Sequence, residues 1–95
     1  MDAPNSFEPE RAGPSPSRLL RAARRRRRWT QARLVAELER VARANGEPVA
    51  SPASLKAMVS RWERGRSTPD DHNGRLLCQA LGIREDDLGV ADDSV

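Results

Sequence analysis

Basic and small polar side chains recur along one stretch, residues 51–69, at the spacing of an α-helix. Ser51 and Pro52 form a helix start, because the serine hydroxyl can cap the first turn and proline fits its first position. The apolar residues fall at i, i+3, i+4 and i+7 and predict a buried stripe: Leu55, Met58, Val59 and Trp62. The opposite side carries groups able to approach a groove and its phosphates: Lys56, Ala57, Ser60, Arg61 and Arg64. The stretch therefore predicts a nucleic-acid recognition helix that Gly65 ends.

The charge distribution favours a polyanionic partner. Residues 18–66 hold 13 Arg and one Lys against four Glu, although the formal net charge of the whole chain is only +3. Positive charge concentrated in one half of a small protein raises the local potential for polyanions, as expected of a nucleic-acid binder. A membrane-surface role would draw on the same charge.

Length and residue types exclude several function classes. A chain of 95 residues with three aromatic residues supports one small core and no cleft of ordinary enzyme size. No nucleophile with a base, metal cluster or phosphate-cradling loop stands out, so we expect no enzyme, no cofactor and no small-molecule substrate. Cys78 lacks metal-spaced partners and is expected in the core, and His72 is expected at a solvated helix start. With no signal peptide and no membrane-spanning run, a cytoplasmic location is expected.

The elements that must position the basic helix are also helices. Residues 1–16 are rich in proline and predict a disordered tail, after which Ser17 is expected to cap a helix over residues 18–27. Thr30 caps the next helix, residues 31–44, whose apolar side chains keep the helical period and which Asn45-Gly46 ends. Thr68-Pro69 is expected to start a helix that runs to Leu81, followed by a last helical turn that ends at Leu88 and a frayed acidic tail, residues 89–95.

Five consecutive arginines, residues 24–28, cannot all face one ligand, because successive side chains on a helix point about 100° apart. We expect Arg24, one turn after Leu20, to turn inward and to be paired there. The rest of the run is either a solvated basic face or a contact for phosphates, and both interpretations stay open.

Several short motifs together resemble the Cro/repressor-type (XRE) helix-turn-helix family. They are Thr30-Gln31 at a helix start, the run from Ser60 to Gly65 with Pro69 four residues later, Leu81-Gly82-Ile83, and Asp87-Leu88. The resemblance covers roughly residues 19–88. It implies a lambda-repressor-like fold: an all-α, compact bundle of four to five short helices over residues 17–88.

The resemblance also implies roles for individual residues. Gln31 would hydrogen-bond a DNA phosphate, Arg64 and Arg66 would meet the backbone, and Glu63 would pair internally with Arg24. Lys56, Ala57 and Arg61 would read base edges in the major groove. We add Arg33 to the expected phosphate contacts, and Ser54 and Ser60 to the expected base-reading residues.

The chain departs from the family pattern in one respect: more residues separate Gln31 from Ser60 than a tight turn between the second and third helices allows. The leading hypothesis is a bacterial, sequence-specific double-stranded DNA-binding protein that regulates transcription and lies at the nucleoid when bound. Whether it forms a homodimer is left open. The alternative is a protein-interaction module, antitoxin-like or sigma-factor-like, which presents the extended second helix to another chain.

Overall fold

Four helices make up the part of the chain that the computed structural model describes, residues 15–84. They are α2 (Pro16–Arg26), α3 (Gln31–Asn45), α4 (Pro52–Glu63) and α5 (Asp71–Leu81). No strand occurs in this range, so the expected small all-α bundle is confirmed. The predictions for residues 1–14, for the last turn ending at Leu88 and for the tail 89–95 fall outside the described residues.

Each helix begins at a side-chain cap, and two of the four caps differ from prediction. Thr30 and Ser51 accept the backbone N–H three residues on, as expected. For α2 the cap is Ser15 rather than Ser17, because Pro16 takes the first helical position and leaves Ser17 inside the first turn. For α5 the cap is Asp70 rather than Thr68: the Asp70 carboxylate accepts the N–H of Asn73 at 2.9 Å.

All four helices contribute to one hydrophobic core. Its fully buried leucines and valine are Leu20, Leu34, Leu38, Leu55, Leu76, Leu77, Leu81 and Val59. Leu19, beside Leu20 on α2, is only half-buried. Trp62 is 4% exposed, so the indole belongs to the core and is not a surface platform for stacking bases.

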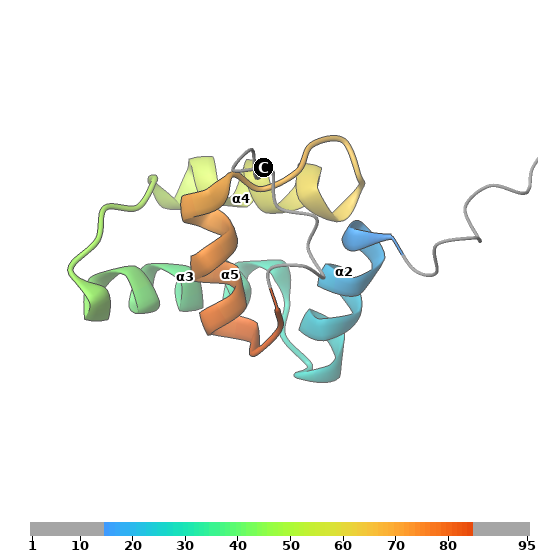
Figure 1. Ribbon diagram of the computed structural model, residues 1–95, viewed down its shortest axis with the longest axis horizontal. Helices are drawn as coiled ribbons and strands as arrows, with labels where there is room; N and C mark the ends of the chain where they lie inside the picture. The colour runs from blue at the N-terminus through green and yellow to red at the C-terminus, as the bar shows by residue number, and fades with distance from the viewer. Residues whose placement is uncertain (1–14, 85–95) are drawn as a thin grey trace, which may run out of the picture.

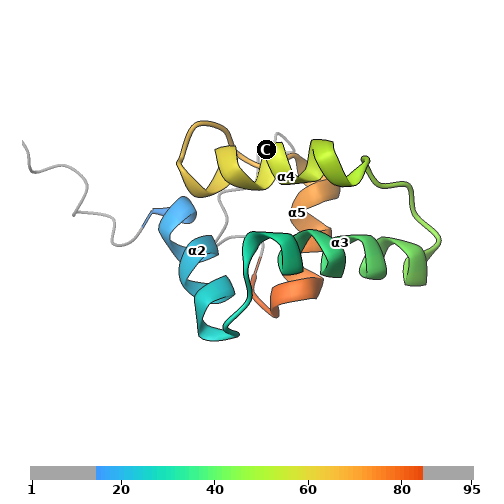
Figure 2. The same ribbon diagram turned by 180° about the vertical axis from the view of Figure 1, so that it is seen from behind.

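The arrangement of the helices leaves α4 at one edge of the molecule (Figures 1 and 2). α3 and α4 pack against each other and run in opposite directions, joined at one end by residues 46–51. α5 crosses them on one face, and α2 stands at the end away from that connection, its start beside the end of α4. The turn from α2 to α3 consequently lies at the opposite edge from α4.

The connection between α3 and α4 is held against α5 by side-chain contacts. Asn45 donates to Gln79 at 2.7 Å, and His72 Nε2 lies 2.8 Å from the carbonyl oxygen of Pro48. Arg75 forms an ion pair with Glu47 at 3.6 Å. His72 lies in the first turn of α5, where it is half-buried and hydrogen-bonded rather than fully exposed. None of the four helices has the length and apolar content needed to cross a membrane.

Candidate nucleic-acid interface

The C-terminal end of α4 is anchored by Glu63, which is 3% exposed. Its carboxylate accepts two hydrogen bonds from Arg24 of α2, Nε to Oε2 at 2.6 Å and Nη2 to Oε1 at 2.8 Å. Gln31 Nε2 of α3 donates to Oε1 at 3.0 Å, and Arg21 donates to the Glu63 carbonyl oxygen at 2.7 Å. The ion pair expected between Arg24 and Glu63 is thus present, and one carboxylate joins three helices.

The pair is ionised despite its burial. Burial opposes ionisation of Glu63, but the hydrogen bonds from Arg24 and Gln31 outweigh it, so the pKa of Glu63 lies below its usual range. The hydrogen bond with Glu63 raises the pKa of Arg24, against a smaller opposing effect of burial. The remaining guanidinium nitrogen of Arg24 donates to the carbonyl oxygen of Trp29 at 2.8 Å, so the buried charge is well satisfied.

Gln31, for which a phosphate contact was expected, is half-buried, and its amide nitrogen points at Glu63. A side-chain amide nitrogen carries two hydrogens, so one remains for a second acceptor. Arg33, the other expected phosphate contact on α3, pairs with Glu37 at 2.9 Å and lies 5.1 Å from the centroid of the Trp29 ring. Hydrogen bonds from Arg40 and Arg33 lower the pKa of Glu37. The Arg33 side chain must therefore break its contacts with Glu37 and Trp29 before it can bind a phosphate.

The helical geometry of α4 separates the expected base-reading residues into those on its outward face and those at the flanks of that face. With about 100° between successive residues, Ala57, Ser60, Arg61 and Arg64 fall within one face roughly 100° wide. Lys56 points about 140° away from Arg61 on the same helix, toward α3. Ser54 is exposed, but its hydroxyl is hydrogen-bonded to that of Ser51 at 3.1 Å. Three expected base-reading residues, Ala57, Ser60 and Arg61, therefore share one face with Arg64, an expected phosphate contact. Lys56 and Ser54 lie at the flanks of this face.

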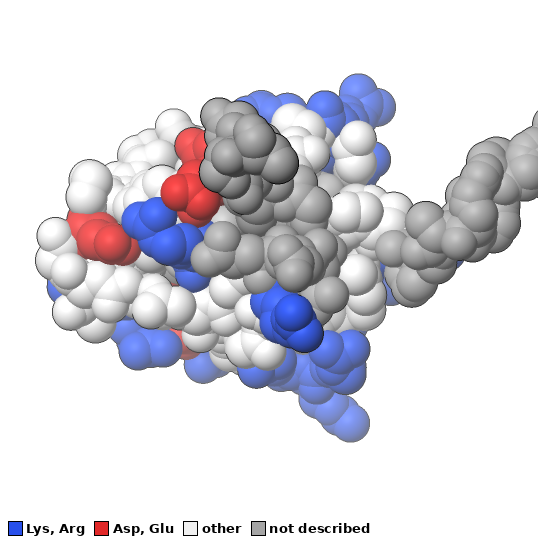
Figure 3. All heavy atoms as spheres, in the orientation of Figure 1, with Lys and Arg blue, Asp and Glu red and all other residues white. Residues whose placement is uncertain are grey.

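Three arginines at the end of α4 and in the loop after it have no ion-pair partner among residues 15–84, and we call them the α4-edge cluster: Arg61, Arg64 and Arg66. All three are exposed. Figure 3 shows basic side chains gathered at the upper edge by the end of α4, whereas the acidic groups on this face lie nearer α5. Charged donors without a carboxylate partner can move to phosphates without breaking an internal contact.

An open, mostly apolar groove of about 330 Å³ separates α3 from the start of α4. Its lining consists of small and apolar side chains with one charge on each wall: Ala32, Val35, Ala36, Pro52 and Ala53, with Glu39 and Lys56. Sequence reasoning did not identify this groove. The sequence feature that indicates the groove is a pair of small residues, Ala32 and Ala36, which lie one turn apart beside the apolar stripe of α3.

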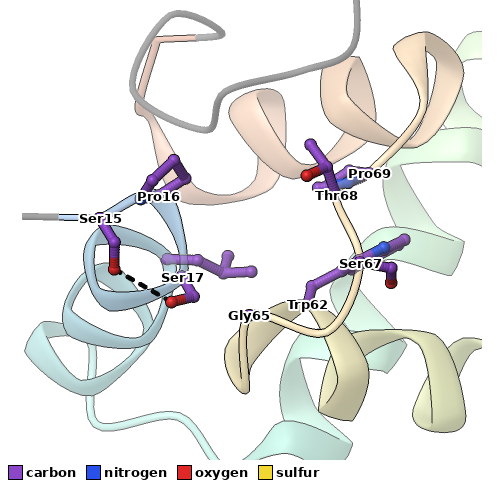
Figure 4. A pocket seen from close by; sticks show the side chains of 9 residues that line it. Ser15, Pro16, Ser17, Trp62, Gly65, Ser67, Thr68 and Pro69 are labelled. Carbon is purple, nitrogen blue, oxygen red and sulfur yellow. Dashed lines mark hydrogen bonds between the residues drawn. The ribbon is translucent and has the colours of Figure 1, made fainter.

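A second cavity, of about 180 Å³, lies between the start of α2 and the loop from α4 to α5 (Figure 4). It is lined by hydroxyls and apolar groups, including Ser15, Ser17, Thr68 and Trp62. No charged side chain lines it, and residues 15–84 contain no group of three His, Cys, Asp or Glu able to hold a metal ion. Cys78 is half-buried against the core rather than fully inside it.

Comparisons of this chain with protein-family models, with curated proteins and with solved structures found no match.

Proposed function

We propose that this protein binds double-stranded DNA in a sequence-specific way, as a bacterial transcriptional regulator of the cytoplasm and nucleoid with a resemblance to the XRE helix-turn-helix family. The observation that carries the proposal is the outward face of α4 at an edge of the molecule, where the α4-edge cluster adjoins Ala57 and Ser60. A helix that projects from an edge can enter the major groove, which admits one α-helix. Within it, Arg61 can contact guanine while Arg64 and Arg66 contact phosphates.

The anchoring of Glu63 supports this role for α4. Base reading requires a helix whose angle to the rest of the domain does not drift, because each contact depends on hydrogen-bond geometry. Arg24, Arg21 and Gln31 hold the end of α4 through four hydrogen bonds, one residue before Arg64 and two residues after Arg61. The inward side of α4 is thus fixed by these hydrogen bonds at the same turn of the helix whose outward side carries Arg61 and Arg64.

We assign α4 the recognition role that the family resemblance implies, but with a different docking angle. In helix-turn-helix proteins the two helices cross steeply, at roughly 90–120°. Here α3 and α4 run in opposite directions side by side, and the connection between them is docked on α5. The outward set on α4 is therefore better placed to read bases than Lys56, which faces α3.

Selection of bound sequences from a random duplex library, with the full chain as bait, tests this function. We expect enrichment of a short motif and an affinity that falls linearly with salt on logarithmic axes. Salt-dependent binding without an enriched motif would remove the claim of sequence specificity. No binding of any duplex at low salt would remove the claim of DNA binding.

A second candidate function is suggested by the groove between α3 and α4. Its apolar lining with Glu39 and Lys56 on opposite walls suits a helix of another protein, so a protein-interaction module, antitoxin-like or sigma-factor-like, is the alternative. Replacement of Ala36, on the α3 wall of the groove, by Gln separates the two functions. This larger, uncharged side chain should block a helix in the groove and leave duplex binding within about twofold, since Ala36 lies on α3 and not on the outward face of α4.

A further inference from the structure

A second group of unpaired arginines lies at the other edge of the molecule, at the end of α2 and in the turn that follows it. We call it the turn cluster: Arg25, Arg26 and Arg28. All three are exposed, and none has an ion-pair partner among residues 15–84. Figure 3 shows these two gatherings of basic side chains apart, one by the end of α4 and one below α2. The turn cluster does not belong to the outward face of α4. DNA binding by α4 therefore does not explain why these three arginines are exposed and unpaired.

The α4-edge cluster and the turn cluster are too far apart for their charges to attract the same part of a straight duplex. They lie at opposite ends of α2, whose 11 residues span about 16 Å at 1.5 Å per residue. This length is about twice the Debye length of roughly 8 Å at physiological ionic strength. A straight duplex along the α4 edge therefore gains little from the turn cluster, which faces the opposite edge.

The backbone of the turn presents these charges in a defined geometry. Arg28 has φ +60°, in the left-handed region where glycine is usual at a helix end. Its N–H bonds the carbonyl oxygen of Arg25 at 2.8 Å, and the N–H of Trp29 bonds that of Arg24 at 3.2 Å. An arginine in this conformation is costly to the fold, and it extends the basic row of α2 around the turn.

The chemistry of the turn favours duplex DNA over a membrane or single-stranded nucleic acid. A membrane surface is held by apolar side chains beside basic ones, and single strands are held by stacking on exposed aromatic rings. The one aromatic residue of the turn, Trp29, is half-buried, and two guanidinium groups already lie over its ring, from Arg27 at 5.6 Å and Arg33 at 5.1 Å. What remains for a partner is charge alone, which suits the phosphates of a duplex.

We propose that the turn cluster binds a second DNA duplex, so that one protein molecule bridges two duplexes, one at the α4 edge and one at the α2–α3 turn. The proposal rests on the proposed DNA binding by α4. It adds a second surface, which contacts phosphates without reading sequence, and an architectural role in holding two DNA segments together.

Capture of a second duplex tests the bridge. The full chain is bound to a bead-attached duplex of about two helical turns, roughly 20 base pairs, and retention of a fluorescent duplex of equal length is measured. Two variants matched in charge are compared: Arg25→Gln/Arg26→Gln/Arg28→Gln for the turn cluster, and Arg61→Gln/Arg64→Gln/Arg66→Gln for the α4-edge cluster. Circular dichroism melting establishes that both variants are folded.

We expect the turn-cluster variant to bind the first duplex within about twofold of the unchanged chain and to lose about tenfold or more in capture of the second. The α4-edge variant should lose affinity for the first duplex. If the turn-cluster variant still captures the second duplex, bridging comes from a dimer through two copies of α4, and the proposal is wrong. An equal loss of first-duplex affinity in both variants would mean that one bent duplex contacts both clusters, which also overturns it.

Failure of the bridge is distinguishable from failure of the proposed function. If the unchanged chain binds the first duplex but captures no second one, the bridge alone is wrong. If it binds neither, DNA binding itself is wrong. If the turn-cluster variant loses binding to anionic vesicles while the unchanged chain binds them and captures no second duplex, the second surface serves a membrane instead.

Discussion

At the residue scale, the carboxylate of Glu63 holds α2, α3 and α4 together through Arg24 and Gln31. Removal of one partner from a buried ion pair leaves the other charge uncompensated, which typically costs about 3 to 5 kcal/mol. With side-chain exposures of 12% and 3%, the Arg24–Glu63 pair falls in this class. We therefore expect Arg24→Ala to lower the free energy of unfolding by about that amount in urea titrations.

The matched control for this prediction is the double variant Arg24→Met/Glu63→Leu. Replacement of both partners by apolar groups removes the charge that the single variant leaves buried, so a large part of the lost stability should return. An unchanged unfolding midpoint in Arg24→Ala would show that the ion pair contributes nothing in solution.

The depressed pKa of Glu63 makes stability depend on pH in the acid range. A carboxyl group with a native pKa below its unfolded value of about 4.3 stabilises the fold above that value and loses the contribution as pH falls through the native pKa. We expect the melting temperature to be flat near neutrality and to drop in acid. In Glu63→Gln, whose side chain does not titrate, the difference from the unchanged chain should be largest at neutral pH and shrink below about pH 4. A constant difference across the range would exclude Glu63 as the titrating group.

We expect the proposed base reading by α4 to depend on Arg61 more than on any other side chain of the outward face. A bidentate arginine contact with guanine contributes about 1 to 3 kcal/mol of discrimination against other bases. Arg61→Ala should weaken binding to the selected motif by that amount and change affinity for random duplex little, as measured by titration of both DNAs. Equal losses on the two DNAs would assign Arg61 to phosphates, and Arg64→Ala is the matched control in which equal losses are expected.

At the element scale, the α2–α3 turn holds a non-glycine residue in a left-handed conformation. A left-handed residue other than glycine costs roughly 1 to 2 kcal/mol, so Arg28→Gly should raise the free energy of unfolding by about 1 kcal/mol. The same variant should weaken capture of the second duplex, which would place function and stability in opposition at this residue. No gain in the unfolding midpoint would show that the left-handed turn is not costly in solution.

Gly46 provides the reverse control for the turn. It has φ +69°, and a Cβ added there meets no atom within 4 Å. Gly46→Ala therefore measures backbone strain without a clash, and we expect a loss of about 1 to 2 kcal/mol by urea unfolding. Similar magnitudes of opposite sign at residues 28 and 46 would show that backbone conformation accounts for both effects.

At the scale of the whole molecule, the unpaired arginines are divided between two edges. The salt dependence of DNA affinity measures how many of these charges contact a given duplex. Neutralisation of each phosphate contributes about 0.9 to the slope of log affinity against log salt. The α4-edge variant should lower the slope for a single duplex by about 2 to 3, and the turn-cluster variant should leave it nearly unchanged. Fluorescence anisotropy over a range of salt concentrations measures both. An equal change of slope in the two variants would mean that the clusters act on the same duplex.

The all-α class, the extent of α4 and most of the core followed from the sequence, because helical period, capping residues and terminating glycines are local properties. Ser51-Pro52, Leu55, Val59 and Trp62 are within one helix and need no distant partner to be interpreted. Two caps were placed wrongly because Ser15 and Ser17, or Thr68 and Asp70, are each acceptable to the backbone as a cap, and only the structure shows that Ser15 and Asp70 are used.

The sequence by itself determined which residues are basic, which helix presents them, and that Arg24 needs a partner. Only the tertiary structure decided which of these charges remain available. Arg33 is occupied by Glu37, Gln31 points at Glu63, and Lys56 faces the groove, because these contacts join side chains whose relation depends on how helices pack. The same packing places α4 and the α2–α3 turn at opposite edges of the molecule. The spacing of residues along the chain does not predict this separation, because it depends on how the helices pack.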